Sequence, residues 1–212
     1  MAASRFKWSQ YLTSPSGIRV IYDLRSAPEI KREWVPVFAE ADYGPEQVAL
    51  RYKEYTRAGT EGFVKAYYDI MISGAQSYAK IFRHLAQPKP SPCLVHCTAG
   101  KDRTGVLVAL LFLLAGAPED EIAKEYALTD LGLAELKPLF KERLLKNPAL
   151  EGSKEGVENM VSSKPENMRA TIEMIKKEFG EAEKYMKANC GLSDEEVNAL
   201  KKNLIETSIS SM

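Results

Sequence analysis

The sequence predicts an α/β fold in which a central, mainly parallel sheet is flanked by helices and extra helices follow at the C-terminal end. Short apolar stretches with strand character are separated by long segments of helical spacing, which is the pattern of a layered α/β protein. The length of 212 residues suits one domain with a sizeable core. We therefore expect a single domain over residues 1–212, with its C-terminal helical part at about 160–212.

Three stretches predict the strands. Residues 17–24, "GIRVIYDL", are β-branched and apolar, as expected of a buried strand. Residues 34–38, "WVPVF", predict a shorter strand at an edge, because Pro36 lacks the N–H group that a sheet ladder needs. The third strand, residues 93–96, follows the proline-rich "PKPSP" and leads directly into the stretch that carries the chemistry.

Four helices are predicted around that stretch. Residues 45–59 begin with proline and end with glycine, and residues 60–87 repeat apolar side chains at helical spacing, with Gly74 as a point where the helix can kink. Two further helices follow, over residues 104–115 and 118–129. Core and lid positions are expected for four tyrosines on the first two helices: Tyr52, Tyr55, Tyr67 and Tyr68.

The C-terminal part predicts a loop and then two helices. Residues 144–165, "LLKNPALEGSKEGVENMVSSKP", are polar and punctuated by proline and glycine, which predicts a loop or a weakly held excursion. A helix begins at Pro165, presents one apolar face and ends at Gly180. The last helix begins with the capping box Ser193-Asp194-Glu195-Glu196.

Composition excludes several classes of protein. The 29 basic residues balance the 29 acidic ones, so no overall field predicts a nucleic-acid partner. The longest apolar run, residues 106–117, is too short to span a bilayer, and the first dozen residues lack the apolar core of a secretion signal.

Three cysteines fit a reducing compartment, so we expect a cytoplasmic location. Their spacing predicts neither a metal site nor a cofactor.

The stretch "HCTAGKDRTG", residues 96–105, joins a strand to a helix and predicts an anion site. The helix N-terminus offers unpaired N–H groups and partial positive charge. Gly100 allows the loop to curl around one anion, and Arg103 can return a bidentate fork to two phosphate oxygens. A nucleotide-binding P-loop is excluded, because Val95 and Asp102 occupy the positions where that motif needs glycine and Ser or Thr.

Cys97 turns this anion site into a candidate enzyme. A helix N-terminus and an arginine both stabilise a negative sulfur, so we expect Cys97 to react as a thiolate and to form a cysteinyl-phosphate intermediate. The loop N–H groups and Arg103 would stabilise the charge of the transition state. The expected phosphate-binding residues are Thr98, Ala99, Gly100, Lys101, Asp102 and Arg103.

Three neighbouring residues have two interpretations each. His96 orients the loop or tunes the thiolate, or else it is a strand-end histidine bonded to the backbone. Thr104 donates its hydroxyl to the sulfur when the sulfur leaves, or caps the helix, and these two roles are compatible. Lys101 adds positive charge for substrate at the mouth of the site, or is solvated there.

With these residues, the chain resembles the cysteine-based protein tyrosine phosphatase superfamily, and within it the bacterial and fungal family with an Ala-Gly-Lys-Asp-Arg-Thr-Gly loop. Supporting stretches are "VIYDLRSAPE", "IAKEYALTD" and the segment from "IEMIKKEFG" to "NALKKNLI". The resemblance implies a parallel sheet flanked by helices, with the catalytic loop after a central strand. The residues before position 17 lack the Asn-x-Arg-Asp-type motif usual in that family.

The general acid has two main candidates. Expelling a tyrosine or serine oxygen needs a proton donor, normally an Asp on a movable loop, and the Trp-Pro-Asp loop of better-known tyrosine phosphatases is absent. Asp42 follows the predicted edge strand, where the family resemblance implies an acid loop, and Glu40 is a more distant third candidate. Asp102 lies inside the loop, as in the similar loop of myotubularin-type lipid phosphatases, but it can equally form an internal salt bridge.

These observations predict a phosphoric monoester hydrolase. Phosphotyrosine in proteins is the first expected substrate, with dual specificity as an extension. Phosphoinositides are the alternative, because a positive Lys101 at the mouth would suit a multiply phosphorylated ring. A phosphate-binding scaffold without catalysis and a sulfur-transfer enzyme are further alternatives. The presence of both Cys97 and Arg103 at this spacing favours phosphate hydrolysis over both.

Overall fold

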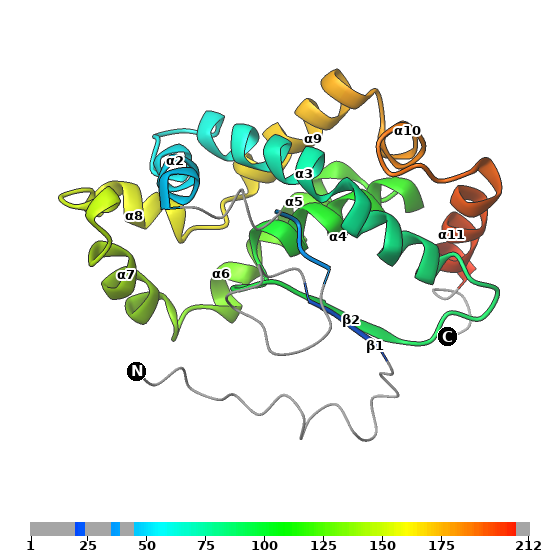
Figure 1. Cartoon of the computed structure of the whole chain (residues 1–212), viewed down its shortest axis with the longest axis horizontal. Helices are drawn as coiled ribbons and strands as arrows, with labels where there is room; N and C mark the ends of the chain where they lie inside the picture. Colours follow the sequence, from blue (N-terminus) through cyan, green and yellow to red (C-terminus); the bar gives the residue numbers. More distant parts are fainter. Residues whose placement is uncertain (1–19, 24–34, 39–44, 207–212) are drawn as a thin grey trace.

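The computed structural model describes residues 20–23, 35–38 and 45–206, and helices make up most of them (Figure 1). Strand β1 (Val20–Asp23) pairs in parallel with strand β2 (Cys93–His96), and Val20 lies opposite Cys93. The helices gather on one side of this strand pair (Figure 1). The β2 strand ends where the 97–103 loop begins, so the pair fixes the entry point of that loop.

The expected central, mainly parallel sheet flanked by helices is seen only in part, because the sheet of the described residues is one parallel pair of strands. Residues 35–38 of the expected edge strand are irregular, and Trp34 lies outside the described residues. Pro36 accepts a hydrogen bond at its carbonyl from the Ser77 hydroxyl of a helix rather than from a strand. The flanking Val37 is buried, so this segment packs on a helix through its side chains.

Helices α2 (Pro45–Tyr55) and α3 (Glu61–Leu85) confirm the two helices predicted before the loop. The α3 helix is amphipathic and buries one long face in the core. It runs through Gly74 as one helix, and a Cβ at that position would lie 3.1 Å from the Val37 side chain. The glycine therefore gives room to residues 35–38 and does not interrupt the helix.

Helices α4 (Asp102–Ala115) and α5 (Glu119–Ala127) follow the loop, as predicted. The α4 helix is apolar over most of its length, because it packs against α3, α5, α10 and α11. Its C-terminus ends at Gly116, whose φ of 81° is the left-handed conformation that glycine adopts most readily. The first turn of α4 is therefore anchored by a helix inside the core.

The predicted loop at residues 144–165 is wrong over much of its length. After α6 (Thr129–Gly132) and α7 (Lys137–Leu145) come a short 3₁₀ turn, η3 (Pro148–Leu150), and helix α8 (Lys154–Met160). Leu150, Val157 and Val161 are buried there, so three apolar side chains stabilise a segment whose local sequence is polar. Of the described residues in α6 and α7, none is buried.

Three helices complete the described residues: α9 (Pro165–Phe179), α10 (Ala182–Ala188) and α11 (Asp194–Glu206). The predicted capping box is confirmed, since the Ser193 hydroxyl accepts from the Glu196 N–H and the Glu196 carboxylate accepts from the Ser193 N–H. Buried side chains of α9, α10 and α11 join those of α3, α4 and α5 in one hydrophobic core.

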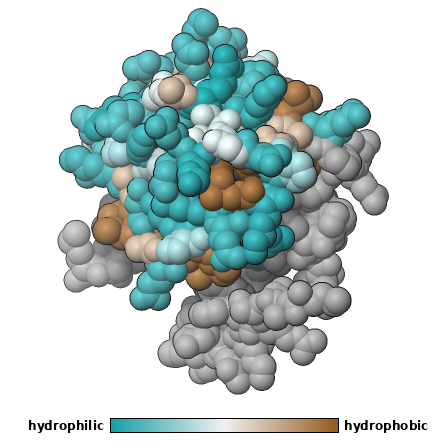
Figure 2. Space-filling view, turned by 90° about the vertical axis from the view of Figure 1, so that its left-hand side faces the viewer, coloured by the Kyte–Doolittle hydropathy of each residue, from teal (hydrophilic) through white to brown (hydrophobic). Residues whose placement is uncertain are grey.

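The surface of the molecule is largely hydrophilic. Figure 2, which views the side where Figure 1 draws α2, α7 and α8, shows a polar surface with separate hydrophobic patches. None of the described helices is long and apolar enough to cross a bilayer. The hydrophobic core lies between α3, α4, α5 and the C-terminal helices, and Cys97 of the 97–103 loop belongs to it.

Candidate active site

The 97–103 loop connects the end of β2 to the first turn of α4 and holds the Cys97 thiol within the molecule. Cys97 is 6% exposed and belongs to the hydrophobic core cluster. Gly100 has a φ of 67°, which a side chain would strain, and a Cβ there would meet nothing within 4 Å. The glycine is needed for the curl of the loop and not for packing space.

Arg103 is held at both its backbone and its side chain. The Tyr78 hydroxyl donates to the Arg103 carbonyl at 2.7 Å. The Arg103 guanidinium donates through Nη2 to the Thr98 hydroxyl at 2.8 Å. Because Thr98 is on the opposite arm of the same loop, this bond spans the loop and keeps the guanidinium over it.

Lys101 lies deep in the molecule, which corrects the expectation of a lysine at the mouth of the site. Its side chain is 5% exposed, and its ammonium pairs with the Asp102 carboxylate at 2.8 Å. The same ammonium donates to the Ser162 carbonyl at 3.2 Å and lies 4.8 Å from the centre of the Phe63 ring. Burial occurs because these partners replace water around the charge.

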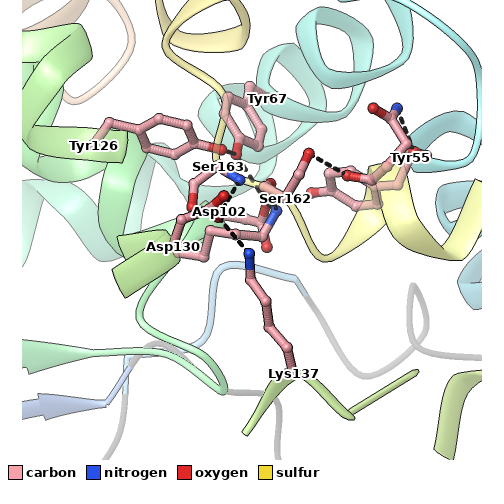
Figure 3. A network of polar contacts seen from close by, with 10 residues as sticks. Tyr55, Tyr67, Asp102, Tyr126, Asp130, Lys137, Ser162 and Ser163 are labelled. Atoms are coloured by element: carbon pink, nitrogen blue, oxygen red, sulfur yellow. Dashed lines mark hydrogen bonds and ion pairs between the residues drawn. The ribbon is translucent and has the colours of Figure 1, made fainter. Parts of the chain in front are cut away.

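Asp102 makes the contacts of the salt-bridge interpretation. Besides Lys101, it accepts a hydrogen bond from the Tyr67 hydroxyl at 2.8 Å (Figure 3). The carboxylate oxygen Oδ1 receives both contacts. The Asp102 side chain thus points toward the core side of the loop, where α3 lies.

Two tyrosine hydroxyls meet on the core side of Asp102, and the sequence analysis assigned neither of them to the site. The hydroxyls of Tyr67, on α3, and Tyr126, on α5, lie 2.7 Å apart (Figure 3). Burial, and after it the negative charge of Asp102, raises the pKa of both phenols well above the usual value. Both therefore keep their protons and serve as donors. The signal in the sequence was Tyr67 itself, which was expected only in the core or lid.

The two remaining neighbours of Cys97 are placed as follows. The His96 ring nitrogen Nδ1 is 3.2 Å from the carbonyl oxygen of Cys97, a backbone contact within the loop. The Thr104 hydroxyl is buried and has no hydrogen-bond partner among the described residues. It does not cap α4, because the cap position is Lys101. An unpaired buried hydroxyl costs free energy unless a partner arrives.

A second polar cluster adjoins the first through the turn between α8 and α9. Ser163 donates from its backbone N–H at 2.7 Å, and also from its hydroxyl, to the Asp130 carboxylate. Lys137 pairs with the same carboxylate at 2.9 Å. The carbonyl of Ser162, the residue before Ser163, accepts a hydrogen bond from Lys101. The two adjacent serines thus join both clusters into the network from Tyr126 to Lys137 that Figure 3 shows.

Two of the acid candidates, Asp42 and Glu40, lie outside the described residues. Among the residues that the structure describes, no three His, Cys, Asp or Glu side chains gather in a way that could hold a metal ion. Cys93 and Cys97 are both free thiols. The described site therefore combines a thiol, a guanidinium and a network of buried donors.

Comparisons with known proteins give a matching family model and related proteins. The family model described as "Tyrosine phosphatase family" matches residues 7–206. A tyrosine-protein phosphatase of Nostoc commune is 26% identical over 199 residues, covering 89% of this chain and 66% of the relative. The triple specificity protein phosphatase PtpB of Mycobacterium tuberculosis is 27% identical over 118 residues, covering 52% of this chain and 42% of the relative. The chain thus spans less than two thirds of the length of either relative.

Proposed function

The chain belongs to the tyrosine phosphatase family, and on that premise we propose that it hydrolyses phosphotyrosine phosphomonoesters through a cysteinyl-phosphate intermediate. The observation that carries the proposal is the 97–103 loop, where one short turn joins a buried thiol to a guanidinium that spans the loop. A phosphate held by the loop N–H groups and by Arg103 would have its phosphorus facing Cys97.

The proposed reaction has two steps, transfer of the phosphoryl group to Cys97 and hydrolysis of the cysteinyl phosphate. The Cys97 thiolate attacks phosphorus, the S–P bond forms, and the P–O bond to the leaving group breaks while the leaving oxygen takes a proton from the acid. Water then attacks phosphorus and gives a proton to the deprotonated acid, and the sulfur leaves as thiolate. Arg103 and the loop N–H groups stabilise the equatorial oxygens in both steps.

Thr104 and His96 have supporting roles in this scheme. The Thr104 hydroxyl, which is buried and unpaired among the described residues, donates to the sulfur as the thiolate leaves. His96 orients the loop through its contact with the Cys97 carbonyl. Both roles follow from the proposal and depend on it.

We assign the proton donor to Asp42. Asp102 is occupied by Lys101 and Tyr67, two donors on the core side of the loop, which supports a positioning role for it. The test compares Asp42→Asn with Asp102→Asn on an alkyl phosphate, a poor leaving group, and on an activated aryl phosphate. The true acid loses turnover strongly on the first substrate and little on the second. Equal losses of Asp42→Asn on both substrates would overturn the assignment.

Phosphotyrosine in proteins is the proposed substrate class, with dual specificity as an extension. Lys101 is buried and paired, so the positive charge that would select a multiply phosphorylated inositol ring is not presented outward. The name of the mycobacterial relative states a triple specificity for that protein. Its relationship to this chain supports testing phosphoserine and phosphoinositides beside phosphotyrosine.

The central experiment measures phosphate release from a phosphotyrosine peptide, a phosphoserine peptide and a set of phosphoinositides. Cys97→Ser removes the nucleophile, and Cys190→Ser is the matched control, because Cys190 is a buried thiol remote from the loop in sequence. We expect release from the phosphotyrosine peptide that Cys97→Ser abolishes and Cys190→Ser retains. Release from lipids alone would keep the mechanism and change the substrate. Phosphate binding without any release would favour the scaffold alternative.

A further inference from the structure

The first turn of α4 rests on three buried tyrosines, here called the tyrosine floor: Tyr67, Tyr78 and Tyr126. Tyr67 and Tyr78 are eleven residues apart on α3, about three helical turns, and so lie on the same face of that helix. One reaches the Asp102 side chain and the other the Arg103 carbonyl. A single helix of the core thus contacts two consecutive residues at the end of the loop.

The direction of the hydrogen bonds in the floor can be derived. The Tyr67 hydroxyl has one proton and donates it to the Asp102 carboxylate, which accepts only. The Tyr126 hydroxyl must then donate to the Tyr67 oxygen, because the two oxygens lie 2.7 Å apart. The chain of donors runs from α5 through α3 to the loop (Figure 3). Such chains polarise each bond and strengthen it.

We infer that Tyr67, supported by Tyr126, is a positioning residue for the proposed phosphatase reaction, acting through Asp102 and Lys101 on the carboxyl half of the 97–103 loop. Tyr67 fixes the Asp102 carboxylate, and the carboxylate holds the Lys101 ammonium inward, against the Ser162 carbonyl. The backbone between Gly100 and Arg103 is then fixed at both of its side chains. This inference rests on the proposed function, because the loop must be the reacting site.

Alignment of the loop acts on the transition state more than on the bound substrate. The N–H groups and Arg103 must match the equatorial oxygens in the transition-state geometry, where charge is largest, whereas ground-state phosphate tolerates a looser loop. Loss of the Tyr67 hydroxyl should therefore lower kcat with little change in KM. A purely structural tyrosine would lower the thermal stability without this separation.

The experiment uses Tyr67→Phe, which keeps the ring and removes one hydroxyl, in the full chain. The substrate is an activated aryl phosphate, whose leaving group needs no acid. Tyr185→Phe is the matched control: Tyr185 is fully buried, and its hydroxyl donates at 2.6 Å to the Met71 carbonyl, a backbone acceptor on α3. We expect kcat to fall about tenfold in Tyr67→Phe, about two- to threefold in Tyr126→Phe and less than about twofold in Tyr185→Phe, at similar losses of melting temperature.

A double-mutant cycle tests the route through Asp102. If Tyr67 acts on the loop through that carboxylate, Tyr67→Phe has almost no further effect in an Asp102→Ala background, which removes the acceptor. Losses that multiply would contradict the route. A kcat loss in Tyr67→Phe no larger than that in Tyr185→Phe would overturn the inference itself.

A binding measurement separates this inference from the proposed function. Vanadate adopts the five-coordinate geometry of the transition state, and inorganic phosphate adopts that of the ground state. Tyr67→Phe should weaken vanadate binding about tenfold and change phosphate binding less than about twofold. If the wild-type protein hydrolyses nothing, the proposed function fails, and the inference, which rests on it, fails with it. If wild-type activity depends on Cys97 but Tyr67→Phe matches Tyr185→Phe, only the inference fails.

Discussion

The tyrosine floor and the α6–α7 segment lie on either side of the turn at Ser162 and Ser163, and they are packed in different ways. In the tyrosine floor, the Tyr67 and Tyr126 hydroxyls meet inside the core. The Lys101–Asp102 pair next to them has side chains that are 5% and 24% exposed. Beside it, the Lys137–Asp130 pair has side chains 20% and 39% exposed. Both pairs reach the same turn, one through Ser162 and the other through Ser163.

The apolar side chains of the two regions also differ in burial. The α4 helix buries Leu107 and Leu110 completely. The residues of α6 and α7 include exposed leucines, such as Leu131 at 75% and Leu139 at 59%. The loop is thus supported by a packed core on one side and by a segment held through ion pairs on the other. A site that must align a transition state needs the first kind of support, and four predictions test the difference.

The largest expected effect is in amide hydrogen exchange. Amides in the middle of α4 should exchange only through global unfolding, whereas those of α7 should exchange through local opening at much lower free energy, because few apolar contacts oppose it. Exchange followed by mass spectrometry on peptides from the two helices measures this. Equal protection of α4 and α7 would contradict the comparison.

A matched pair of leucine truncations is expected to show the next largest difference. Leu110→Ala removes a fully buried side chain and should lower the free energy of unfolding by about 2–5 kcal/mol. Leu139→Ala removes a side chain that is mainly in water and should change it by less than about 0.5 kcal/mol. Urea unfolding of both variants gives the two values. Similar costs would mean that α7 is packed in solution as α4 is.

Replacing Lys101 should cost more unfolding free energy than replacing Lys137, but the difference should be smaller than for the two leucines. Lys101→Met leaves Asp102 without its charged partner in a mostly buried place and should cost about 2–3 kcal/mol of unfolding free energy. Lys137→Met breaks a partly exposed pair and should cost less than about 1 kcal/mol. The same urea experiment decides between them. A larger cost for Lys137→Met would reverse the comparison.

The smallest expected effect is the pH dependence of the outer pair. Partial burial raises the pKa of Asp130, but hydrogen bonds from Ser163 and the ammonium of Lys137 outweigh this and lower its pKa overall. Its stabilising contribution is therefore present above the unfolded pKa of about 4 and is lost as the pH falls through the lower folded value. Melting temperatures of wild type and Asp130→Asn should differ at pH 7 and converge in acid. A difference that is constant with pH would exclude this role of the carboxylate.

Prediction from sequence succeeded where structure is local. The helix from Pro165 to Gly180 and the capping box at Ser193 were confirmed, because neighbouring residues decide both of them. The β2 strand at residues 93–96 was confirmed as well, although it pairs with the distant β1. It failed at residues 144–165, where buried Leu150 and Val157 stabilise η3 and α8 against a polar local pattern. It failed also at residues 35–38, whose partner is the Ser77 hydroxyl of α3.

The sequence by itself predicted the candidate phosphate loop, because Cys97 and Arg103 are six residues apart and the chain between a strand and a helix N-terminus must bring them to one turn. Tertiary structure alone decided what supports that loop. Lys101 points inward, and Tyr67 and Tyr126 meet beneath Asp102, through contacts between residues 35 to 61 positions apart. No local pattern encodes these contacts, since they depend on how α3, α5 and the turn before α9 pack around the loop. A buried charge or hydroxyl takes the partners that the packing provides, because leaving it without one costs more free energy than any local preference.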